Sequence, residues 1–389
     1  MVRYKDLSNL ISSSGITMQI KCGSGLRQFV RKASTIQNID YANRSLKLPD
    51  GAVVFSLIQP TGKFHLGNYL GAVRVWTELS EDAPAGGKCI FGTADLHAIT
   101  IPKPDGNAFR QMRHEAIASL LAVGIDPTKS ILFHQSQVPE HAELCWYLST
   151  LTSMGALNRM TQWKTKANIK DTSSEKVGAV KLGLFTYPVL QAADVLLYKS
   201  THIPVGEDQV QQLELTRQLA QAFNSTYKTR YFREPTTLLT PTRKVLSLQN
   251  PLKKMSKSDA NQNSCICVTD EPDAIRRKIR SAVTDSIGHE FKYDPEGRPG
   301  VSNLINIVAG IQKKTIAAVE ADIAGFKDHA TFKNYVTDIL VAELRGPREE
   351  FARYMNDKSY IYEVERNGAE RAGAIAAKTL AEVRAIMGY

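Results

Sequence analysis

The sequence has no long uncharged apolar run and no regularly spaced cysteine pairs. Its most apolar stretch, Val177 to Tyr198, contains Lys181 and Asp194, whereas a membrane-spanning helix needs about 18 or more apolar residues. The five cysteines are an odd number and include no C-x-x-C pair, which excludes a disulfide scaffold and a zinc ribbon. We therefore expect no membrane insertion, and thiols that simply pack in a reducing compartment.

The composition is that of a globular chain with a mild excess of positive charge. Its 389 residues are 43% hydrophobic and 23% charged, and this length predicts about two to three domains. The apolar material is sufficient for a core without a disulfide or metal staple. The formal net charge of +10 permits a polyanionic partner but does not require one.

Residues 1–50 have a composition different from the rest of the chain. They carry eight basic and three acidic residues, contain no Glu and lack the apolar core of a secretory signal. A basic, Ser-rich and acid-poor segment is typical of an organellar transit peptide. We expect a disordered mitochondrial targeting leader over residues 1–48, cleaved between Arg31 and Asp50, and a mature protein in the mitochondrial matrix. The alternative is a disordered basic tail that contacts nucleic acid.

Short β-branched runs alternate with amphipathic helices in residues 49–265. The runs 51–58, 88–94 and 130–134 read as buried strands, and a helix is expected over 68–78. This alternation predicts an α/β fold, a Rossmann-like doubly wound parallel sheet. Ligands of such sheets bind at the carboxyl ends of the strands.

Residues 266–389 are expected to form a separate all-helical domain. Apolar residues recur at helical spacing over Leu304–Ile311 and Phe332–Leu340, and again along a last helix from Ala372 to Met387. Gly346-Pro347 and similar pairs punctuate the pattern.

Three loops could hold a nucleotide. The first, Gln59–Asn68, has two glycines that let backbone N–H groups approach a phosphate, and His65 could donate to phosphate oxygens, although the Walker and dinucleotide signatures are absent. The second, Lys253–Asp259, carries three lysines and two serines, which suit a transient phosphate charge. The third is Gly206–Gln209. Taken alone, the first loop could be an ordinary strand–helix turn and the second a solvated basic loop. The third could be an acidic first turn of a helix, which complements the helix dipole.

Taken together, these loops resemble elements of a known enzyme class. His65-Leu66-Gly67-Asn68 resembles the HIGH element of class I aminoacyl-tRNA synthetases, and Lys254–Ser258 is similar to an unaltered KMSKS element. Other segments resemble the bacterial-type tryptophanyl-tRNA synthetases, namely Ile58–Gly62, Gly67–Ala72, Asp95–Thr100, Arg159–Gln162, Ala192–Asp194 and Pro204–Gln209. The resemblance runs from about Val53 to the C-terminus, and the basic leader makes the chain similar to the mitochondrial form of the family.

The resemblance implies a two-step ligase reaction with ATP, Mg²⁺, L-tryptophan and tRNA(Trp). The tryptophan carboxylate attacks the α-phosphate of ATP, pyrophosphate leaves, and the terminal ribose of the tRNA then takes the acyl group. Such phosphoryl transfer depends on positioning and charge stabilisation and needs no protein nucleophile. The magnesium ion is expected on the phosphates with few protein ligands.

The same resemblance assigns roles to individual residues. The catalytic groups implied are His65, Asn68, Lys254 and Lys257. The ATP-binding residues implied are Gln59, Pro60, Thr61, Gly67, Asn68, Gly206, Glu207, Asp208, Val245, Lys254, Met255, Ser256, Lys257 and Ser258. The tryptophan-binding residues implied are Phe55, His97, Tyr187, Gln191, Asp194, Val205 and Gln209, with Asp194 accepting the indole N–H.

Two features need comment, namely a substitution in the implied tryptophan pocket and a pair of residues with metal-ligand spacing. Gln191 stands where several bacterial relatives carry Met, so a polar amide replaces an apolar packing contact, and it could help to hold Asp194. The pair Asp95 and His97 has the spacing of half a metal site, but two ligands without a third do not make one, and we predict no protein metal site.

The resemblance also implies partners and domain contacts. Residues 266–389 would read the tRNA anticodon, and the last helix would pack back on the catalytic domain 49–265. The family forms symmetric homodimers, so a homodimer is expected here.

Three alternative functions share some of these features. A nucleotidyltransferase that adenylates a small acid would use loop 59–68 but would not need the helical part. A tyrosyl-tRNA synthetase has a pocket for a phenol and usually an altered lysine loop, so Ala192-Ala193-Asp194 argues against it. An RNA-binding scaffold derived from a synthetase would be expected to lose Lys254, Lys257 or Asp208, and all three are present.

Overall fold

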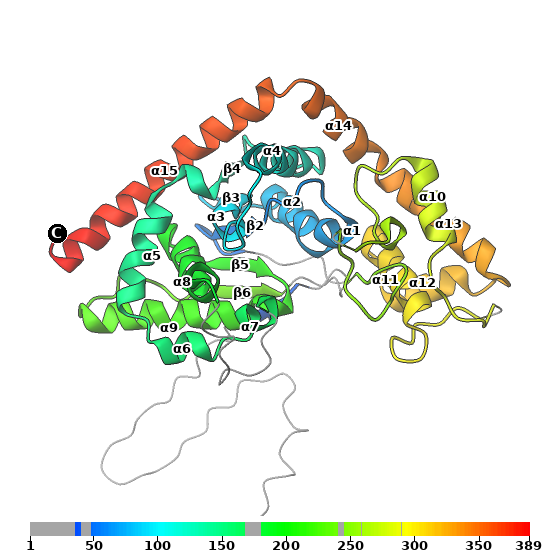
Figure 1. Ribbon diagram of the computed structural model, residues 1–389, viewed down its shortest axis with the longest axis horizontal. Coiled ribbons are helices and arrows are strands. Elements are labelled where there is room, and N and C mark those ends of the chain that lie inside the picture. Colours follow the sequence, from blue (N-terminus) through cyan, green and yellow to red (C-terminus); the bar gives the residue numbers. More distant parts are fainter. Residues whose placement is uncertain (1–35, 40–47, 168–179, 240–244, 258, 289) are drawn as a thin grey trace, which may run out of the picture. The chain divides into compact units, whose positions relative to one another are not determined.

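Six parallel strands form one sheet in the order β1-β6-β5-β2-β3-β4 (Figure 1). The computed structural model describes residues 36–39, 48–167, 180–239, 245–257, 259–288 and 290–389. The strands are β1 (Ile36–Asn38), β2 (Val53–Ile58), β3 (Lys88–Thr93), β4 (Ser130–His134), β5 (His202–Val205) and β6 (Thr236–Leu239). From β2 the chain winds outward to β3 and β4, and then returns to β5 and β6 on the other side. The predicted Rossmann-like doubly wound α/β sheet is confirmed.

The strands follow the apolar runs because both faces of the sheet are covered. All five residues of β4 are buried, as are all residues of β3 except Lys88. The β2–β3 register runs from Val53 opposite Lys88 to Ile58 opposite Thr93, so the two strands end at the same level. Their carboxyl ends therefore present the following loops at one edge of the sheet.

The helices of the sheet region surround these strands (Figure 1). They are α1 (Leu66–Asn68), the π-helical turn η1 (Tyr69–Val73), α2 (Arg74–Glu81), α3 (Asp95–Ala98), α4 (Gly106–Ala122), η2 (Gln135–Gln137), α5 (Glu140–Thr150), α6 (Met154–Asn158), α7 (Gln162–Lys166), α8 (Leu182–Leu197), η4 (Glu207–Gln209) and α9 (Val210–Thr226). The helix expected over 68–78 thus consists of three consecutive elements, with a π-helical turn in the middle.

The chain after residue 265 is helical, as expected. Its elements after the turn η5 (Gln262–Ser264) are α10 (Pro272–Arg280), α11 (Pro299–Gln312), α12 (Ile316–Ile323), α13 (His329–Glu343), α14 (Arg345–Asn356) and α15 (Ser359–Met387). One hydrophobic cluster contains Trp76 and Phe91 from the sheet region together with Leu304 and Phe332 from α11 and α13. The helical part therefore shares a core with the sheet.

The long helix α15 returns to the sheet and lies beside β4 (Figure 1). Its buried residues Ala372, Ala376 and Leu380 belong to the same cluster as Phe55 and Ile90 of the sheet. At Gly368 the helix backbone comes so close to β4 that an added Cβ would lie 1.8 Å from the carbonyl oxygen of Leu132. Only glycine fits this crossing.

Strand β1 lies inside the segment 1–48 for which a leader is predicted. Ile36, Gln37 and Asn38 pair in parallel with Thr237, Leu238 and Leu239 of β6, and the Ile39 amide donates to the Leu239 carbonyl. The remainder of the predicted leader, residues 1–35 and 40–47, lies outside the described residues. Within the described part of the chain, no helix is both long and apolar enough to cross a membrane.

Candidate active site

A cleft of about 880 Å³ opens where β2 and β5 end. Most of the predicted site residues line it, namely Phe55, Gln59, His65, Gly67, Asn68, His97, Tyr187, Gln191, Asp194, Val205, Gly206, Glu207, Asp208, Gln209, Val245 and Lys254. The structure thus brings together side chains that are up to about 200 positions apart in the sequence, as expected at the switch point of a doubly wound sheet.

Five predicted ATP-binding residues do not line the cleft. They are Pro60, Thr61, Met255, Ser256 and Lys257, while Ser258 lies outside the described residues. The side chain of Met255 is only 2% exposed and belongs to the hydrophobic core, so a contact of this residue with ATP would come from its backbone. An apolar thioether gains more from burial than from contact with a phosphate. Its backbone N–H donates to the Val245 carbonyl at 3.0 Å, so Met255 anchors the lysine loop.

His65 caps the short helix α1 at the mouth of the first loop. Its Nδ1 accepts hydrogen bonds from the backbone N–H groups of Gly67 (3.0 Å) and Asn68 (3.3 Å), and Asn68 Oδ1 accepts one from the His65 N–H. A Cβ on Gly67 would lie 2.8 Å from the imidazole ring, so this position needs glycine. The capping bonds hold the ring in one orientation.

The surroundings of His65 determine both its charge and its tautomer. Burial, together with the positive charges of Lys257 and Lys254, lowers the pKa of His65 to about 4. The imidazole is therefore neutral at physiological pH. Because Nδ1 accepts from the backbone, the single ring proton is on Nε2. The ring offers a hydrogen-bond donor without a positive charge.

Lys257 connects the second loop to the first. Its ammonium group donates to the Thr61 carbonyl at 2.6 Å and also to the Lys63 carbonyl. Burial lowers the pKa of Lys257 from its usual range. The sequence resemblance places this lysine on the phosphates of ATP, whereas here it lies against the backbone of the loop Gln59–Asn68.

Asp194 of α8 is a buried carboxylate held by three donors. Its Oδ2 accepts from His97 Nε2 at 2.8 Å, and its Oδ1 accepts from Gln135 Nε2 and His141 Nδ1, both at 2.7 Å. Burial alone would raise the pKa of Asp194, but the charge of His97 and the hydrogen bonds from His141 and His97 outweigh it and lower the pKa to about 2. The group therefore stays ionised in an otherwise largely apolar wall.

Asp95 faces away from His97. It accepts from the Ser136 backbone N–H at 2.8 Å and from the Ser136 hydroxyl at 2.5 Å, and it pairs with Arg113 at 2.9 Å. His97 instead donates to Asp194. Asp95 and His97, whose spacing suggested half of a metal site, therefore belong to two separate polar clusters.

A chain of amides forms the polar rim of the cleft. Gln191 Nε2 donates to Gln209 Oε1 at 3.1 Å, and Gln209 Nε2 donates to Asp208 Oδ2 at 2.8 Å. Gln162 donates to the Asp208 carbonyl at 2.6 Å and accepts from the Tyr187 hydroxyl at 2.9 Å. The expectation that Gln191 could help to hold Asp194 is not met, because its amide N–H₂ is directed to Gln209.

Sequence reasoning missed several residues of the site. Gln135 and His141 hold Asp194, Lys166 lies in the cleft wall with its ammonium 4.4 Å from the centre of the Tyr187 ring, and Tyr293 lines the cleft from the helical part of the chain. Gln135 directly follows the buried strand β4, and this position after a strand is the one signal that could have identified it.

Comparisons with known proteins agree with this geometry. Residues 50–344 match the family model described as "tRNA synthetases class I (W and Y)". The chain is 57% identical over 366 residues to a mitochondrial tryptophan–tRNA ligase of Saccharomyces cerevisiae, with 92% of this chain and 97% of the relative covered.

Two solved structures extend the comparison. A tryptophanyl-tRNA synthetase of Mycoplasma pneumoniae is similar with a TM-score of 0.75 and 33% identity, covering 87% of this chain and 98% of that one. The enzyme of Campylobacter jejuni complexed with ADP and tryptophan is similar with a TM-score of 0.68 and 30% identity, covering 87% of this chain and 100% of that one. The chain therefore belongs to the class I tryptophanyl-tRNA synthetase family.

Proposed function

We propose that this chain is a tryptophan–tRNA ligase that makes tryptophanyl-adenylate from L-tryptophan and ATP and then esterifies tRNA(Trp). The observation that carries the proposal is the Asp194 carboxylate, which is ionised, only 2% exposed, and lines the cleft at the carboxyl ends of the parallel strands. The similarity to the Saccharomyces cerevisiae ligase supports the same substrates.

Asp194 has one acceptor position left for a ligand. A carboxylate offers about four lone-pair directions, and His97, Gln135 and His141 use three of them. An indole N–H that enters between Phe55 and Tyr187 would take the fourth. A ligand without this donor would leave a buried charge incompletely paired, so the site would reject it.

The adenylation step needs groups that stabilise charge on the phosphates. A tryptophan carboxylate oxygen bonds to the α-phosphorus, and the bond from this phosphorus to the bridging oxygen breaks, so that pyrophosphate leaves with the electron pair. His65 Nε2–H would donate to a phosphate oxygen, because the backbone N–H groups of Gly67 and Asn68 already donate to Nδ1 of the same ring. Lys254 lines the cleft and would balance the charge of the leaving pyrophosphate.

Mg²⁺ would enter with ATP. The loop Gln59–Asn68 contains no acidic residue, and the described part of the lysine loop Lys253–Asp259 contains a single one, Asp259. This composition fits a magnesium ion that the phosphate oxygens hold and that needs few protein ligands.

The second step and the location of the enzyme follow from the same assignment. The helical part, which shares a core with the sheet, would bind the tRNA and read its anticodon. The mitochondrial relative and the basic leader support action in mitochondrial translation, in the matrix. Because β1 belongs to the sheet, the leader would end before Ile36.

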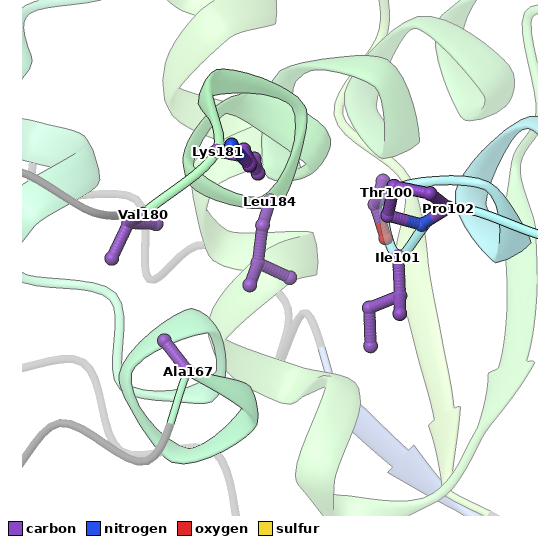
Figure 2. A pocket seen from close by; sticks show the side chains of 7 residues that line it. All are labelled: Thr100, Ile101, Pro102, Ala167, Val180, Lys181 and Leu184. Atoms are coloured by element: carbon purple, nitrogen blue, oxygen red, sulfur yellow. The ribbon is translucent and has the colours of Figure 1, made fainter.

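A homodimer is part of the proposal. Exposed apolar side chains occur at Ile99 (48%), Ile101 (52%) and Leu182 (71%). Ile101 also lines a hollow of about 230 Å³ with Leu184 of α8 (Figure 2). A second copy would remove this apolar surface from water. Sedimentation equilibrium should give a dimer for the full chain and a monomer for the double variant Ile101→Asp with Leu182→Asp, whereas Leu252→Asp, which also alters an exposed leucine, should remain dimeric.

The central test is amino-acid-dependent ATP–pyrophosphate exchange on the full chain. We expect exchange with tryptophan and none with tyrosine. Asp194→Asn should lower kcat/KM for tryptophan by between about fivefold and 150-fold, equivalent to about 1–3 kcal/mol, without changing the KM for ATP. Asp273→Asn, which alters an exposed carboxylate, should behave like the wild type.

Other outcomes of this test would contradict the proposal in different ways. Exchange with tyrosine would retain the adenylation chemistry but overturn the role of Asp194. A folded protein that supports exchange with none of the twenty amino acids would favour the RNA-binding scaffold.

A further inference from the structure

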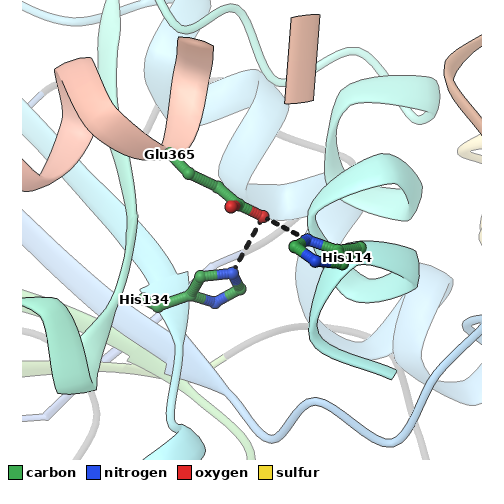
Figure 3. Close-up of side chains that lie close together, drawn as sticks. All are labelled: His114, His134 and Glu365. Atoms are coloured by element: carbon green, nitrogen blue, oxygen red, sulfur yellow. Dashed lines mark hydrogen bonds and ion pairs between the residues drawn. The ribbon is translucent and has the colours of Figure 1, made fainter. Parts of the chain in front are cut away.

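Three side chains with metal-binding atoms meet where α4, β4 and α15 pack together. His114 Nδ1 of α4 lies 3.0 Å from Glu365 Oε1 of α15, and His134 Nε2 at the end of β4 lies 2.9 Å from the same oxygen (Figure 3). One ligand atom of each residue lies within 4.8 Å of those of the other two. The three residues come from distant parts of the sequence, and both imidazoles point at one carboxylate.

The donor set matches the preferences of zinc. Two imidazole nitrogens and one carboxylate oxygen are borderline ligands that suit Zn²⁺ better than Mg²⁺ or Ca²⁺. Zinc lies about 2.0–2.2 Å from such atoms, which separates the ligand atoms by about 3.3 Å in a tetrahedron. The two imidazole–carboxylate distances, 3.0 and 2.9 Å, are already close to this value, whereas the two imidazole nitrogens, which lie within 4.8 Å of each other, would have to approach by up to about 1.5 Å.

The charge at this cluster favours a cation. Glu365 is 6% exposed and His134 is 1% exposed, so the carboxylate has lost most of its water. In the part of the chain that the structure describes, the ion pairs of Glu365 are with the two imidazoles and not with Lys or Arg. A bound divalent cation would balance the buried negative charge of Glu365.

The surroundings hold the ligands in place before a metal arrives. Thr93 Oγ1 is hydrogen-bonded to His134 Nδ1, which orients that ring with Nε2 toward Glu365. The Tyr362 ring packs edge-on against His114 with ring centres 5.2 Å apart. Gly368, one helical turn after Glu365, fixes the distance between α15 and β4. Ligands on rigid elements with an outer hydrogen bond are typical of built metal sites.

We propose that His114, His134 and Glu365 form a zinc site that fastens α15 to α4 and β4. A water molecule would complete the tetrahedral coordination. The site differs from the substrate cleft, because none of the three residues lines it. Because zinc binds neutral imidazoles, the proton of each ring would move from the nitrogen that faces Glu365 to the other ring nitrogen, with no net loss. The Thr93 hydroxyl can switch from donor to acceptor as His134 Nδ1 gains this proton.

The test is a titration of the purified full-length, metal-free protein with Co²⁺ and then with Zn²⁺. We expect visible absorption typical of tetrahedral Co²⁺ at about one equivalent per chain, which Zn²⁺ then abolishes. His134→Ala and Glu365→Gln should weaken binding by more than about 100-fold, and Thr93→Val by about 10- to 100-fold. His329→Asn alters a histidine of α13 and should bind like the wild type.

A second measurement distinguishes loss of metal binding from loss of folding in the variants. Zn²⁺ should raise the thermal midpoint of the wild type and of His329→Asn, but not that of Glu365→Gln, because ligand binding stabilises only a protein that has the site. A wild type without stoichiometric Co²⁺ absorption would overturn the proposal. So would equal binding by Glu365→Gln, or sulfur-to-metal charge-transfer absorption, which would assign the ion to cysteine thiolates instead.

Discussion

At the scale of single residues, His65 shows how a backbone contact determines side-chain chemistry. The imidazole accepts from two backbone N–H groups and lies near Lys254 and Lys257, so it remains neutral and keeps its proton on Nε2. A neutral donor can bind phosphate oxygens without an ion pair that would have to be broken when the product leaves. The helix cap and the proposed phosphate contact therefore use the two different nitrogens of one ring.

This arrangement predicts an acid-sensitive stability. The pKa of His65 is about 4 in the folded protein and near 6.5 when the ring is exposed on unfolding. The stabilisation is fully present above pH 6.5 and is lost as the pH falls toward 4, because only the unfolded chain takes up the proton; its full extent is about 3 kcal/mol. Urea unfolding at pH 7, 6 and 5 should show a smaller loss in His65→Asn, which retains an N-cap acceptor.

The low pKa values of Asp194 and Glu365 do not interfere with this measurement. Both carboxyls have a pKa of about 2, so the stability that they contribute is lost only as the pH falls below about 4.5. If His65→Asn and the wild type lose stability in parallel between pH 7 and 5, the ring is not the group that titrates.

The individual site residues differ in how far the sequence could predict them. Asp194 was identifiable because Ala192-Ala193-Asp194 resembles a family element. Gln135 and His141 were not, because they lie 59 and 53 positions before Asp194 and meet it only through the packing of β4, α5 and α8. The burial of the Met255 side chain could not be predicted either, since the motif does not show which of its side chains packs in the core.

At the scale of elements, the two phosphate-side loops behave as one structure. The backbone of Phe64 and Leu66 exchanges hydrogen bonds with Ile266 and Val268, and Lys257 reaches across to the carbonyls of Thr61 and Lys63. The loop that would close over ATP is therefore already tied to the loop that would cradle it. Closure would require Lys257 to exchange backbone carbonyls for phosphate oxygens.

This exchange predicts a kinetic effect for Lys257→Ala. Loss of a charged donor that acts in the transition state typically costs about 2.7–4 kcal/mol, which corresponds to about a 100- to 1,000-fold decrease in kcat. The KM for ATP should change by less than about threefold, because ground-state binding would rely on other groups. Steady-state exchange kinetics on the wild type, Lys257→Ala and the loop control Lys253→Ala would measure this. An increase in KM with kcat unchanged would mean that Lys257 only binds the ground state.

The crossing of α15 over β4 predicts opposite effects for two glycines of one helix. Gly368→Ala would place a methyl group 1.8 Å from the Leu132 carbonyl oxygen, whereas no atom lies within 4 Å of a Cβ added at Gly373. Gly368→Ala should therefore lower the free energy of unfolding by about 3 kcal/mol or more. Gly373→Ala should raise it by about 0.5–1 kcal/mol, since alanine favours the helix. Urea denaturation of both variants provides the measurement, and equal effects would contradict the close approach.

At the scale of the whole molecule, three of the six described strands were predicted from the sequence, whereas the first strand, β1, was not. The strands 51–58, 88–94 and 130–134 are visible in the sequence because both of their faces are buried and their apolar runs are continuous. The edge strand Ile36–Asn38 has three exposed residues and no period, so nothing in its sequence distinguishes it from the basic segment before it. Its existence depends on the free edge of β6, which comes about 200 residues later.

The position of β1 predicts that two truncations will differ. Removal of residues 1–34 leaves β1 in place, so the urea midpoint and tryptophan-dependent exchange should match those of the full chain. Removal of residues 1–47 also deletes β1, its pairing with Thr237–Leu239 and the Ile39 hydrogen bond to Leu239. With about 0.5–1.5 kcal/mol for each hydrogen bond lost, this protein should be less stable by about 2–4 kcal/mol, and its exposed β6 edge should promote aggregation. Equal midpoints for the two truncated proteins would show that β1 contributes nothing to the sheet, and that the whole of 1–47 can be treated as leader.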